Sequence, residues 1–309
     1  MDKCNPKADN IVKIPIVREE TRIGSVFNDL FKVVHKTEGI DSNSVIWDFQ
    51  GTSFFHPFFI APLILYRKNS SKTIEVVNKS SAVDSYFKHI HFDDLYHIDD
   101  DRTLEQFLNK YRKKTYIPVC RFEPLKRNVD NIQTIIQNII EWQSRAGSKI
   151  KSPLSYFLGE LICNIGEHSD AKYGYIFSQC LSYKEKVLNI CIADDGITVF
   201  GRYVKTNKFL NEINDNEAKS LKLANEGFST KNLPDGQTRG FGIPTSKRML
   251  VEGLKGAFFM LSGGAFHRYE HGKSDYINLP PKMNWKGTVI LMKIPVMIPK
   301  DFNYMDYVT

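Results

Sequence analysis

Three polar residues of types that take part in chemistry are spaced four apart in this chain of 309 residues: Glu160, Asn164 and His168. Residues with this spacing on an α-helix lie on the same face in neighbouring turns. A carboxylate, a carboxamide and an imidazole therefore project in line. This face of the predicted helix therefore carries groups that can take part in chemistry. The alternative interpretation is the ordinary solvated face of an amphipathic helix.

The helix that must position this row is predicted over residues 152–169. Ser152 is a suitable N-cap, and Pro153 fits the first helical turn, where a missing N–H costs nothing. The apolar residues recur at helical spacing and form one stripe: Leu154, Leu158, Leu161, Ile162 and Ile165. The pattern predicts one helix with a buried apolar face and a polar face that borders a site.

Another candidate group follows a predicted strand. Residues 173–181 and 187–193 alternate well enough to form two paired strands, and the second is followed by Asp194, Asp195 and Gly196. A carboxylate at a strand end can lie on the floor of a cleft and accept a hydrogen bond from a ligand amine. A simple Asp-Gly turn is the other interpretation of these residues.

A long polar region with glycines follows at residues 207–237, with a helix predicted near 216–226. A long loop of this kind inside a compact domain is typical of a functional segment. It leads into a helix predicted at 243–251, and the N–H groups at such a helix start bind anions. The residues here that are placed to hold phosphates are Gly240, Phe241 and Gly242.

Two further strands are predicted near the C-terminus, at residues 257–261 and 288–294, and Thr288 begins the second. Between them, residues 267–274 read HRYEHGKS and nearly spell a phosphate-binding glycine loop. His267, however, stands where that motif requires its first glycine. We therefore predict a surface loop at 272–274.

Four motifs occur in a fixed order: ExxxN on a helix, DDG after a strand, GFG before a helix and GT before a last strand. This order resembles the GHKL superfamily of ATPases with the Bergerat fold. The superfamily includes histidine kinases, anti-sigma-factor serine kinases, DNA gyrase and mismatch-repair ATPases. The resemblance implies an α+β fold over residues 122–309, in which helices lie on one face of a mixed sheet. It also implies ATP and Mg²⁺ as cofactors.

The resemblance assigns roles to single residues. Glu160 resembles the catalytic general base, and Asn164 resembles the Mg²⁺ ligand. Asp194 resembles the acceptor of the adenine amine, with Gly196 allowing the ring to approach and Thr288 supporting the contact. The other nucleotide-binding residues implied by the resemblance are His168, Arg239, Gly240, Phe241 and Gly242. Lys231 and Arg239 resemble lid cations that reach phosphate, and a solvated surface role is the alternative for each.

The chain departs from the family pattern at Thr198 and Thr238, where glycines are expected, and at Glu167, where kinases often have a cation. A carboxylate near a triphosphate is repulsive unless a cation intervenes. Two functions stay open. The first is an ATPase or a protein-serine/threonine kinase of the anti-sigma type, in which Glu160 activates the acceptor. The second is a nucleotide-gated protein-interaction module with little or no turnover.

Residues 1–121 are predicted to form a separate, small α/β domain. Strands and helices are expected to alternate there, at 45–49, 57–66, 73–77 and 81–90. This order resembles the STAS domain of anti-sigma-factor antagonists, in which a strand that ends in Asp leads into a helix. Phosphorylated STAS domains have Ser or Thr at the start of that helix, whereas this chain has His56 and Pro57.

The boundary between the two domains is predicted at the charged segment 123–128, which contains a proline. A helix at 103–111 and a strand at 115–121 are predicted before it. An amphipathic helix is predicted after it, at 131–143, and is expected to pack beside the helix at 152–169.

The composition, 42% hydrophobic and 25% charged, is that of a globular protein long enough for two domains. The net charge of +7 permits an acidic partner, but dispersed lysines and acidic stretches argue against nucleic acid. Five cysteines without CxxC spacing and the absence of a signal peptide favour a cytoplasmic protein. The most apolar run, 54–66, is too short to span a membrane. Another protein and a second copy of the chain are the candidate partners.

Overall fold

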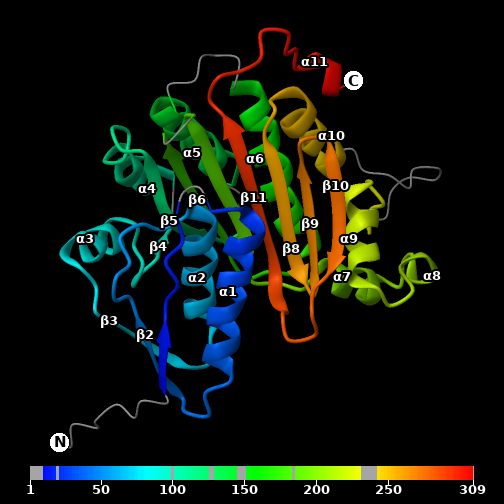
Figure 1. Ribbon diagram of the computed structural model, residues 1–309. Helices are drawn as coiled ribbons and strands as arrows, with labels where there is room; N and C mark the ends of the chain where they lie inside the picture. The colour runs from blue at the N-terminus through cyan, green and yellow to red at the C-terminus, as the bar shows by residue number, and fades with distance from the viewer. Residues whose placement is uncertain are drawn as a thin grey trace, which may run out of the picture. The chain divides into compact units, whose positions relative to one another are not determined.

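The computed structural model describes residues 10–18, 21–98, 101–124, 129–144, 151–182, 185–230 and 242–308. The chain divides into two compact units, Met1–Leu95 and Tyr96–Thr309. Each unit combines helices with a β-sheet (Figure 1). The α+β class predicted from the sequence is therefore confirmed.

The first unit contains a three-stranded parallel sheet in the order β1-β2-β3. Its elements are β1 (Ile11–Lys13), α1 (Ile23–Glu38), β2 (Ser44–Asp48), α2 (Pro57–Asn69), β3 (Thr73–Val77) and α3 (Ser81–His89). The four elements predicted within residues 45–90 are confirmed. Helix α1 was not predicted, although its buried residues Ile23, Val26, Phe27 and Leu30 have helical spacing.

Helix α2 begins at the position where the STAS pattern has a phosphorylated residue. His56 is the N-cap of this helix, because its Nδ1 accepts a hydrogen bond from the Phe58 N–H at 3.1 Å. Pro57 follows as the first helical residue, and the helix is buried from there to Leu65. The buried helix predicted for this apolar run is confirmed, and the imidazole takes the capping role that Ser or Thr often has.

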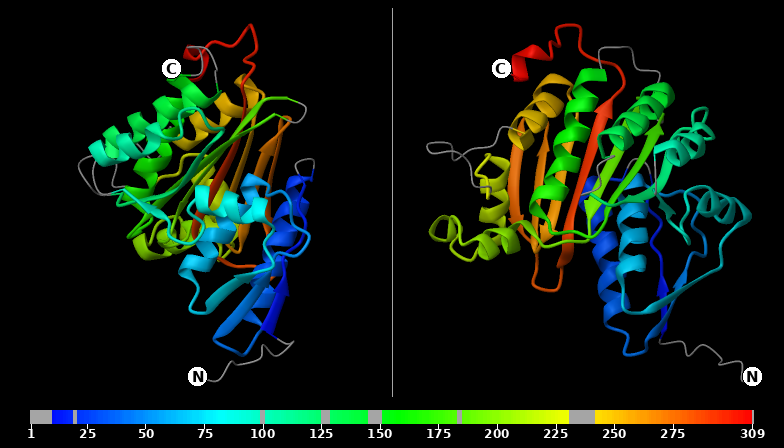
Figure 2. Two further views of the ribbon diagram at one scale, coloured as in Figure 1. Left: turned by 90° about the vertical axis from the view of Figure 1, so that its left-hand side faces the viewer. Right: turned by 180° about the vertical axis from the view of Figure 1, so that it is seen from behind.

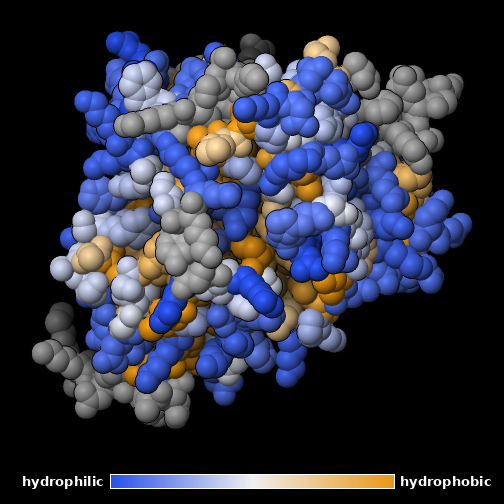
Figure 3. Space-filling view, turned by 45° about the horizontal axis from the view of Figure 1, so that its top comes forward, coloured by the Kyte–Doolittle hydropathy of each residue, from blue (hydrophilic) through white to orange (hydrophobic). Residues whose placement is uncertain are grey.

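Among the helices of the described ranges, none has the length and apolar character needed to cross a membrane. Hydrophilic residues cover most of the face seen in Figure 3, and hydrophobic residues show in smaller areas between them. Single exposed apolar residues such as Met297 are normal on a protein surface.

The second unit is built on an eight-stranded sheet in the order β10-β9-β8-β11-β7-β6-β5-β4. Its strands are β4 (Tyr96–His97), β5 (Tyr116–Phe122), β6 (Gly174–Leu181), β7 (Val187–Asp194), β8 (Ala257–Gly263), β9 (Ala265–Glu270), β10 (Lys273–Asn278) and β11 (Trp285–Pro295). Neighbouring strands are antiparallel except for the parallel pair β4 and β5. The register pairs Val289 with Ala193, so Asp194 and Thr288 lie at the same end of adjacent strands.

The boundary between the units lies earlier in the chain than the segment 123–128 that the sequence indicated. Backbone hydrogen bonds join β4 to β5 and β5 to β6, so residues 96–122 belong to the larger sheet. Helix α4 (Asp101–Asn109) connects the first two of these strands. The strand predicted at 115–121 is present, but a single short strand carries no local signal of which sheet it joins.

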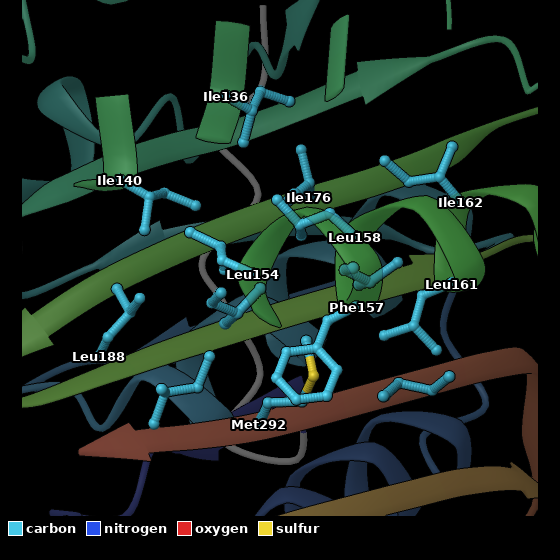
Figure 4. Close-up of a cluster of buried hydrophobic side chains, with 14 of the residues drawn as sticks. Ile136, Ile140, Leu154, Phe157, Leu158, Leu161, Ile162, Ile176, Leu188 and Met292 are labelled. Atoms are coloured by element: carbon cyan, nitrogen blue, oxygen red, sulfur yellow. The ribbon is translucent and has the colours of Figure 1, made fainter. Parts of the chain in front are cut away.

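Helices cover one face of the larger sheet, where α5 (Val129–Ser144) lies beside α6 (Lys151–His168) (Figure 2). Apolar side chains of α6, including Phe157 and Leu158, lie among those of α5 and the strands, such as Ile176 and Met292 (Figure 4). The predicted apolar stripe is buried throughout, which confirms that prediction. The helix begins at Lys151, so Ser152 lies in the first turn and not at the cap.

The remaining helices come after β7 in the chain. They are α7 (Val199–Thr206), α8 (Leu210–Ile213), α9 (Glu217–Asn225), α10 (Gly242–Arg248), the π-helical turn η3 (Met249–Gly253) and α11 (Met305–Val308). Helix α9 agrees with the helix predicted near 216–226, and the side chain of Asn216 caps it. Helix α10 contacts α6, which places the start of α10 near the polar face of α6.

The segment that nearly spells a glycine loop, residues 267–274, is a β-hairpin. Strands β9 and β10 pair through Glu270 and Lys273, and both turn residues, His271 and Gly272, have positive φ. Two such residues are typical of a two-residue type I′ turn. The surface loop predicted at 272–274 is therefore wrong, since residues 273 and 274 begin β10.

Candidate functional site

One cavity of about 350 Å³ lies in the second unit, beside α6 and the adjacent ends of β7 and β11. The predicted site residues that line it are Glu160, Asn164, His168, Asp194, Gly242 and Thr288. They come from four separate segments of the chain. The predicted residues Arg239, Gly240 and Phe241, together with Lys231, lie outside the described residues.

Asp194 is the most deeply buried carboxylate of the cavity, with 6% of its surface exposed. It ends β7, and its Oδ1 accepts a hydrogen bond from the Gly196 N–H at 2.9 Å. Burial raises the pKa of Asp194 to about 7, although the backbone N–H groups of Gly196 and Thr288 act in the opposite direction. A carboxylate in such a place is well suited to accept a hydrogen bond from a ligand N–H.

The strand beside Asp194 supplies hydroxyl groups. The Thr288 Oγ1 lies 3.0 Å from the Oγ of Ser262 on β8, and that Oγ also accepts a hydrogen bond from the Val199 N–H at 3.0 Å. Ser262 is buried and was not predicted. The only feature of the sequence that could have indicated Ser262 is its position as a polar residue near the end of an apolar strand. The two hydroxyls tie β8, β11 and the start of α7 together behind the carboxylate of Asp194.

Gly287 allows β11 to approach β7 closely. Its φ of +76° is in the left-handed region, and a Cβ there would lie 2.3 Å from the Asp194 carbonyl oxygen. Only glycine meets both conditions without strain. The GT pair of the sequence therefore has a backbone role next to Asp194 in addition to the side-chain role of Thr288.

Gly196 also has a structural role, which differs from the one that the family resemblance implies. A Cβ at this position would lie 2.1 Å from the Ser169 carbonyl oxygen, just past the end of α6. That carbonyl accepts a hydrogen bond from the Ile197 N–H at 2.7 Å. Gly196 does not line the cavity. The glycine is required because two backbone segments meet here.

Replacing Gly196 with Ala is therefore expected to lower the free energy of unfolding by about 1–3 kcal/mol, because the clash is with backbone atoms that cannot rotate away. Thermal denaturation measures this loss. Gly24→Ala is the matched control, since Gly24 is helical and a Cβ added there has no other atom within 4 Å. Equal melting temperatures for Gly196→Ala and the wild type would contradict the proposed contact.

The polar face of α6 forms one wall of the cavity. The Asn164 Nδ2 donates a hydrogen bond to the Glu160 carbonyl at 2.6 Å, which uses the nitrogen end of the carboxamide. The oxygen end is the one that a hard metal ion prefers. One turn further along, the His168 Nδ1 lies 3.0 Å from the Thr230 Oγ1. All three residues line the cavity, as the spacing along the helix predicted.

Glu160 lies against the first residue of α10. A Cβ on Gly242 would be 1.8 Å from the Glu160 Oε2, so a side chain there would displace the carboxylate. Tyr156, one turn before Glu160, also lines the cavity, and both burial and the charge of Glu160 raise the pKa of its phenol. The start of α10 and the carboxylate of Glu160 are thus placed next to each other.

Arg202 on α7 is a cation of the cavity wall that was not predicted. Its Nη1 lies 3.1 Å from the Asp170 Oδ1, and its Nη2 donates to the Glu167 carbonyl at 3.2 Å. The Glu167 side chain is exposed and does not line the cavity. The repulsion predicted between this carboxylate and a triphosphate therefore loses its basis.

Thr198, which stands where the family pattern has a second glycine, has a local role. Its Oγ1 accepts a hydrogen bond from the Gly201 N–H at 2.9 Å, so it is the N-cap of α7. Thr198 therefore begins helix α7, and Arg202 of this helix lines the cavity. It leaves Asp194 and its hydrogen bonds in place.

The described residues contain no cluster of three or more His, Cys, Asp or Glu side chains that could hold a metal ion. Asn164 and Glu160 are oxygen donors that line the same wall. Mg²⁺ is bound by few protein oxygens when phosphate and water complete its shell. The donors present fit that mode and do not fit a metal site formed by protein alone.

Comparison with protein-family models, with curated proteins and with solved structures finds no match for this chain.

Proposed function

We propose that the second unit binds ATP with Mg²⁺ and either hydrolyses it or transfers its γ-phosphoryl group to a Ser or Thr of a partner protein. The observation that carries this proposal is that Glu160, Asp194 and Thr288, far apart in the sequence, line one cavity with a buried carboxylate. Helices on one face of a mostly antiparallel sheet support a Bergerat-type domain of the GHKL superfamily.

In this proposal Asp194 accepts a hydrogen bond from the exocyclic amine of adenine. The buried carboxylate lacks the solvation that an exposed one has, so a ligand donor replaces lost hydrogen bonds. Guanine has a carbonyl oxygen where adenine has this amine, and that oxygen would be repelled. Thr288 lines the cavity together with Asp194 and supplies a hydroxyl there, and this hydroxyl lies 3.0 Å from the Ser262 Oγ. The site therefore selects adenine over guanine.

Glu160 acts as the general base in this proposal. It removes the proton of a water molecule, or of an acceptor hydroxyl, while that oxygen forms a bond to the γ-phosphorus and the bond to the bridging oxygen of ADP breaks. Asn164 would hold Mg²⁺, which supplies neutralising charge to the phosphates when it is bound. Gly242 allows the first turn of α10 to approach Glu160, because only a residue without a side chain fits against this carboxylate.

The first unit is a STAS-like regulatory domain in this proposal. Its parallel sheet has β2 ending at Asp48, followed by a turn and then α2, which is the order that the resemblance implies. His56 and Pro57 at the start of α2 distinguish it from STAS domains that are phosphorylated there. We propose a cytoplasmic setting, with another protein or a second copy of the chain as partner.

A nucleotide-gated interaction module without turnover is the second candidate. Arg202 is the one lysine or arginine among the described residues that line the cavity, and its guanidinium is held by Asp170 and the Glu167 carbonyl. Phosphoryl transfer needs positive charge at the γ-phosphate. If no further cation reaches it, ATP would bind and change the surface without being consumed.

Mg²⁺ is expected to bind only together with nucleotide. Because the wall offers few oxygen donors, Mg²⁺ alone should have a Kd above about 1 mM, whereas it should strengthen the binding of a non-hydrolysable ATP analogue by at least about tenfold. Calorimetric titration with and without EDTA measures both. Asn164→Ala should remove the Mg²⁺ effect, and Cys163→Ala, the exposed neighbour, should keep it. Tight Mg²⁺ binding without nucleotide would contradict this assignment.

A further inference from the structure

A lysine is buried between α9 and α10, the two helices on either side of residues 226–241. Lys247 lies on α10, with 7% of its surface exposed. Its Nζ donates to the Asn225 carbonyl at 3.1 Å and lies 3.4 Å from the Asn225 Oδ1. Asn225 is the last residue of α9, and α10 begins at Gly242. One side chain therefore joins the end of the helix before the loop to the helix after it.

Neutral groups surround this ammonium. Besides Asn225, the Nζ lies 3.2 Å from the Tyr276 hydroxyl on β10, and the rings of Tyr276 and Tyr269 are within 6 Å. Burial lowers the pKa of Lys247 to about 8, and the charge of Glu226 opposes this shift. Lysine is rarely buried without a paired carboxylate. Packing alone would be served as well by an apolar residue of the same length.

The partner of Lys247 is itself fixed. The Asn225 Nδ2 donates to the Leu221 carbonyl at 2.9 Å, which turns its Oδ1 toward the lysine. The ammonium also lies at the C-terminal end of α9, where the helix dipole and the last carbonyls favour a cation. Lys247, on α10, thus donates a hydrogen bond to a carbonyl group at the C-terminal end of α9.

Both helices carry walls of the candidate nucleotide cavity. Ala224, next to Asn225, lines it on one side, and Gly242 lines it on the other, against Glu160. A change in the spacing of α9 and α10 would therefore move both walls. The buried His267, which stacks on Tyr276 at 4.0 Å, packs behind the lysine and leaves it little room to move.

We propose that Lys247 is a positioning residue: it holds the end of α9 and α10 together, and so fixes the two walls that flank residues 226–241 for nucleotide binding. The effect on nucleotide rests on the proposed function, whereas the tie between the helices does not. A cavity with fixed walls binds more tightly because less ordering remains to be done on binding.

Limited trypsin digestion without nucleotide tests the tie itself. Cleavage after Lys231 and Arg239, followed by mass spectrometry, should be at least about fivefold faster in Lys247→Met than in the wild type, because α9 and α10 are no longer joined by this side chain. Arg248→Met is the matched control, since the side chain of Arg248 is 58% exposed and only approaches Glu252. It should be cleaved at the wild-type rate. Equal rates for Lys247→Met and the wild type would overturn the inference.

Calorimetry and thermal denaturation separate positioning from simple stability. Lys247→Met should bind a non-hydrolysable ATP analogue at least about tenfold more weakly while its melting temperature stays equal or rises. Wild-type affinity in this variant would overturn the inference and leave the proposed function intact. If the wild type binds no nucleotide, the proposed function fails, and the trypsin rates still decide the role of Lys247.

A milder variant covers the case in which Lys247→Met does not fold. Tyr276→Phe removes a single partner of the Nζ and keeps the ring. Cleavage of Tyr276→Phe after Lys231 and Arg239 should be faster than in the wild type and slower than in a folded Lys247→Met. A wild-type rate in a folded Tyr276→Phe would then count against the tie.

Discussion

Replacing Glu160 with Gln is expected to lower the rate of ATP hydrolysis or phosphoryl transfer by at least about 100-fold, while the affinity for nucleotide changes by less than about threefold. Glutamine keeps the size and the hydrogen-bonding oxygen of the side chain, but it cannot accept the proton of the attacking group. Its neighbours, Asn164 and Gly242, retain their places. Phosphate release and calorimetric titration of the same preparation measure the two quantities.

Glu167→Gln is the matched control, because Glu167 lies two turns further along α6, is exposed and does not line the cavity. Glu167→Gln should hydrolyse ATP, or transfer its phosphoryl group, at the wild-type rate. Full activity in Glu160→Gln would show that another group removes the proton. A wild type that binds nucleotide but releases no phosphate, with or without a partner, would favour the nucleotide-gated module.

Asp194→Asn is expected to weaken nucleotide binding and to stabilise the fold. The lost hydrogen bond from a charged, buried acceptor should reduce binding by about 1–3 kcal/mol. The free energy of unfolding should rise, because the ionised carboxylate is held in a place that disfavours charge. Opposite signs for the two effects distinguish a functional buried group from a structural one.

The pH dependence of this stabilisation follows from the pKa shift. Asp194 has a pKa of about 7 in the folded chain against 3.8 for the unfolded one, so the folded state binds more protons between these values. Its contribution to stability is therefore lost as pH rises from about 4 to 7, which amounts to at most about 4 kcal/mol. Asp194→Asn should be more stable than the wild type at pH 8, and this advantage should vanish below about pH 4.

Denaturant unfolding at a series of pH values measures this advantage. Glu167→Gln is the control, because this carboxylate is exposed and does not line the cavity. A pH-independent difference between Asp194→Asn and the wild type would contradict a buried, ionisable carboxylate at the floor of the cavity.

Local patterns in the sequence were sufficient for most elements around the site. The apolar stripe from Leu154 to Ile165 defines the buried face of α6 without reference to other segments, and the spacing of four then fixes which polar residues share the opposite face. Alternation in residues 173–181 and 187–193 likewise predicted β6 and β7, with Asp194 at the end of the second.

Features that depend on contacts between distant segments were not predictable in this way. Arg202 lines the cavity because α7 packs near β7, and Ser262 on β8 contacts the lining residue Thr288. Neither residue is marked by its neighbours in the sequence. Glycine is required at position 196 because a side chain there would clash with the carbonyl group of Ser169, which belongs to another segment. Residues 96–121 were assigned to the wrong unit because strand pairing is decided by tertiary structure.

The β9–β10 hairpin was missed for a different reason. Its turn has histidine at a position of positive φ, where Asn or Gly is the usual signal. His267, which stands where the glycine-loop motif requires its first glycine, is buried on β9 and packs behind Lys247. A polar residue in a short strand gives little indication of burial, so the network around Lys247 became apparent only from the packed structure.

Calorimetric titration of the purified chain with a non-hydrolysable ATP analogue and Mg²⁺, for the wild type and Asp194→Asn side by side, tests the central claim most directly. The proposed ATP site predicts saturable binding of one nucleotide per chain to the wild type and binding at least about fivefold weaker to the variant. No binding to the wild type, or equal binding to both proteins, would contradict a nucleotide cavity with Asp194 as its adenine acceptor.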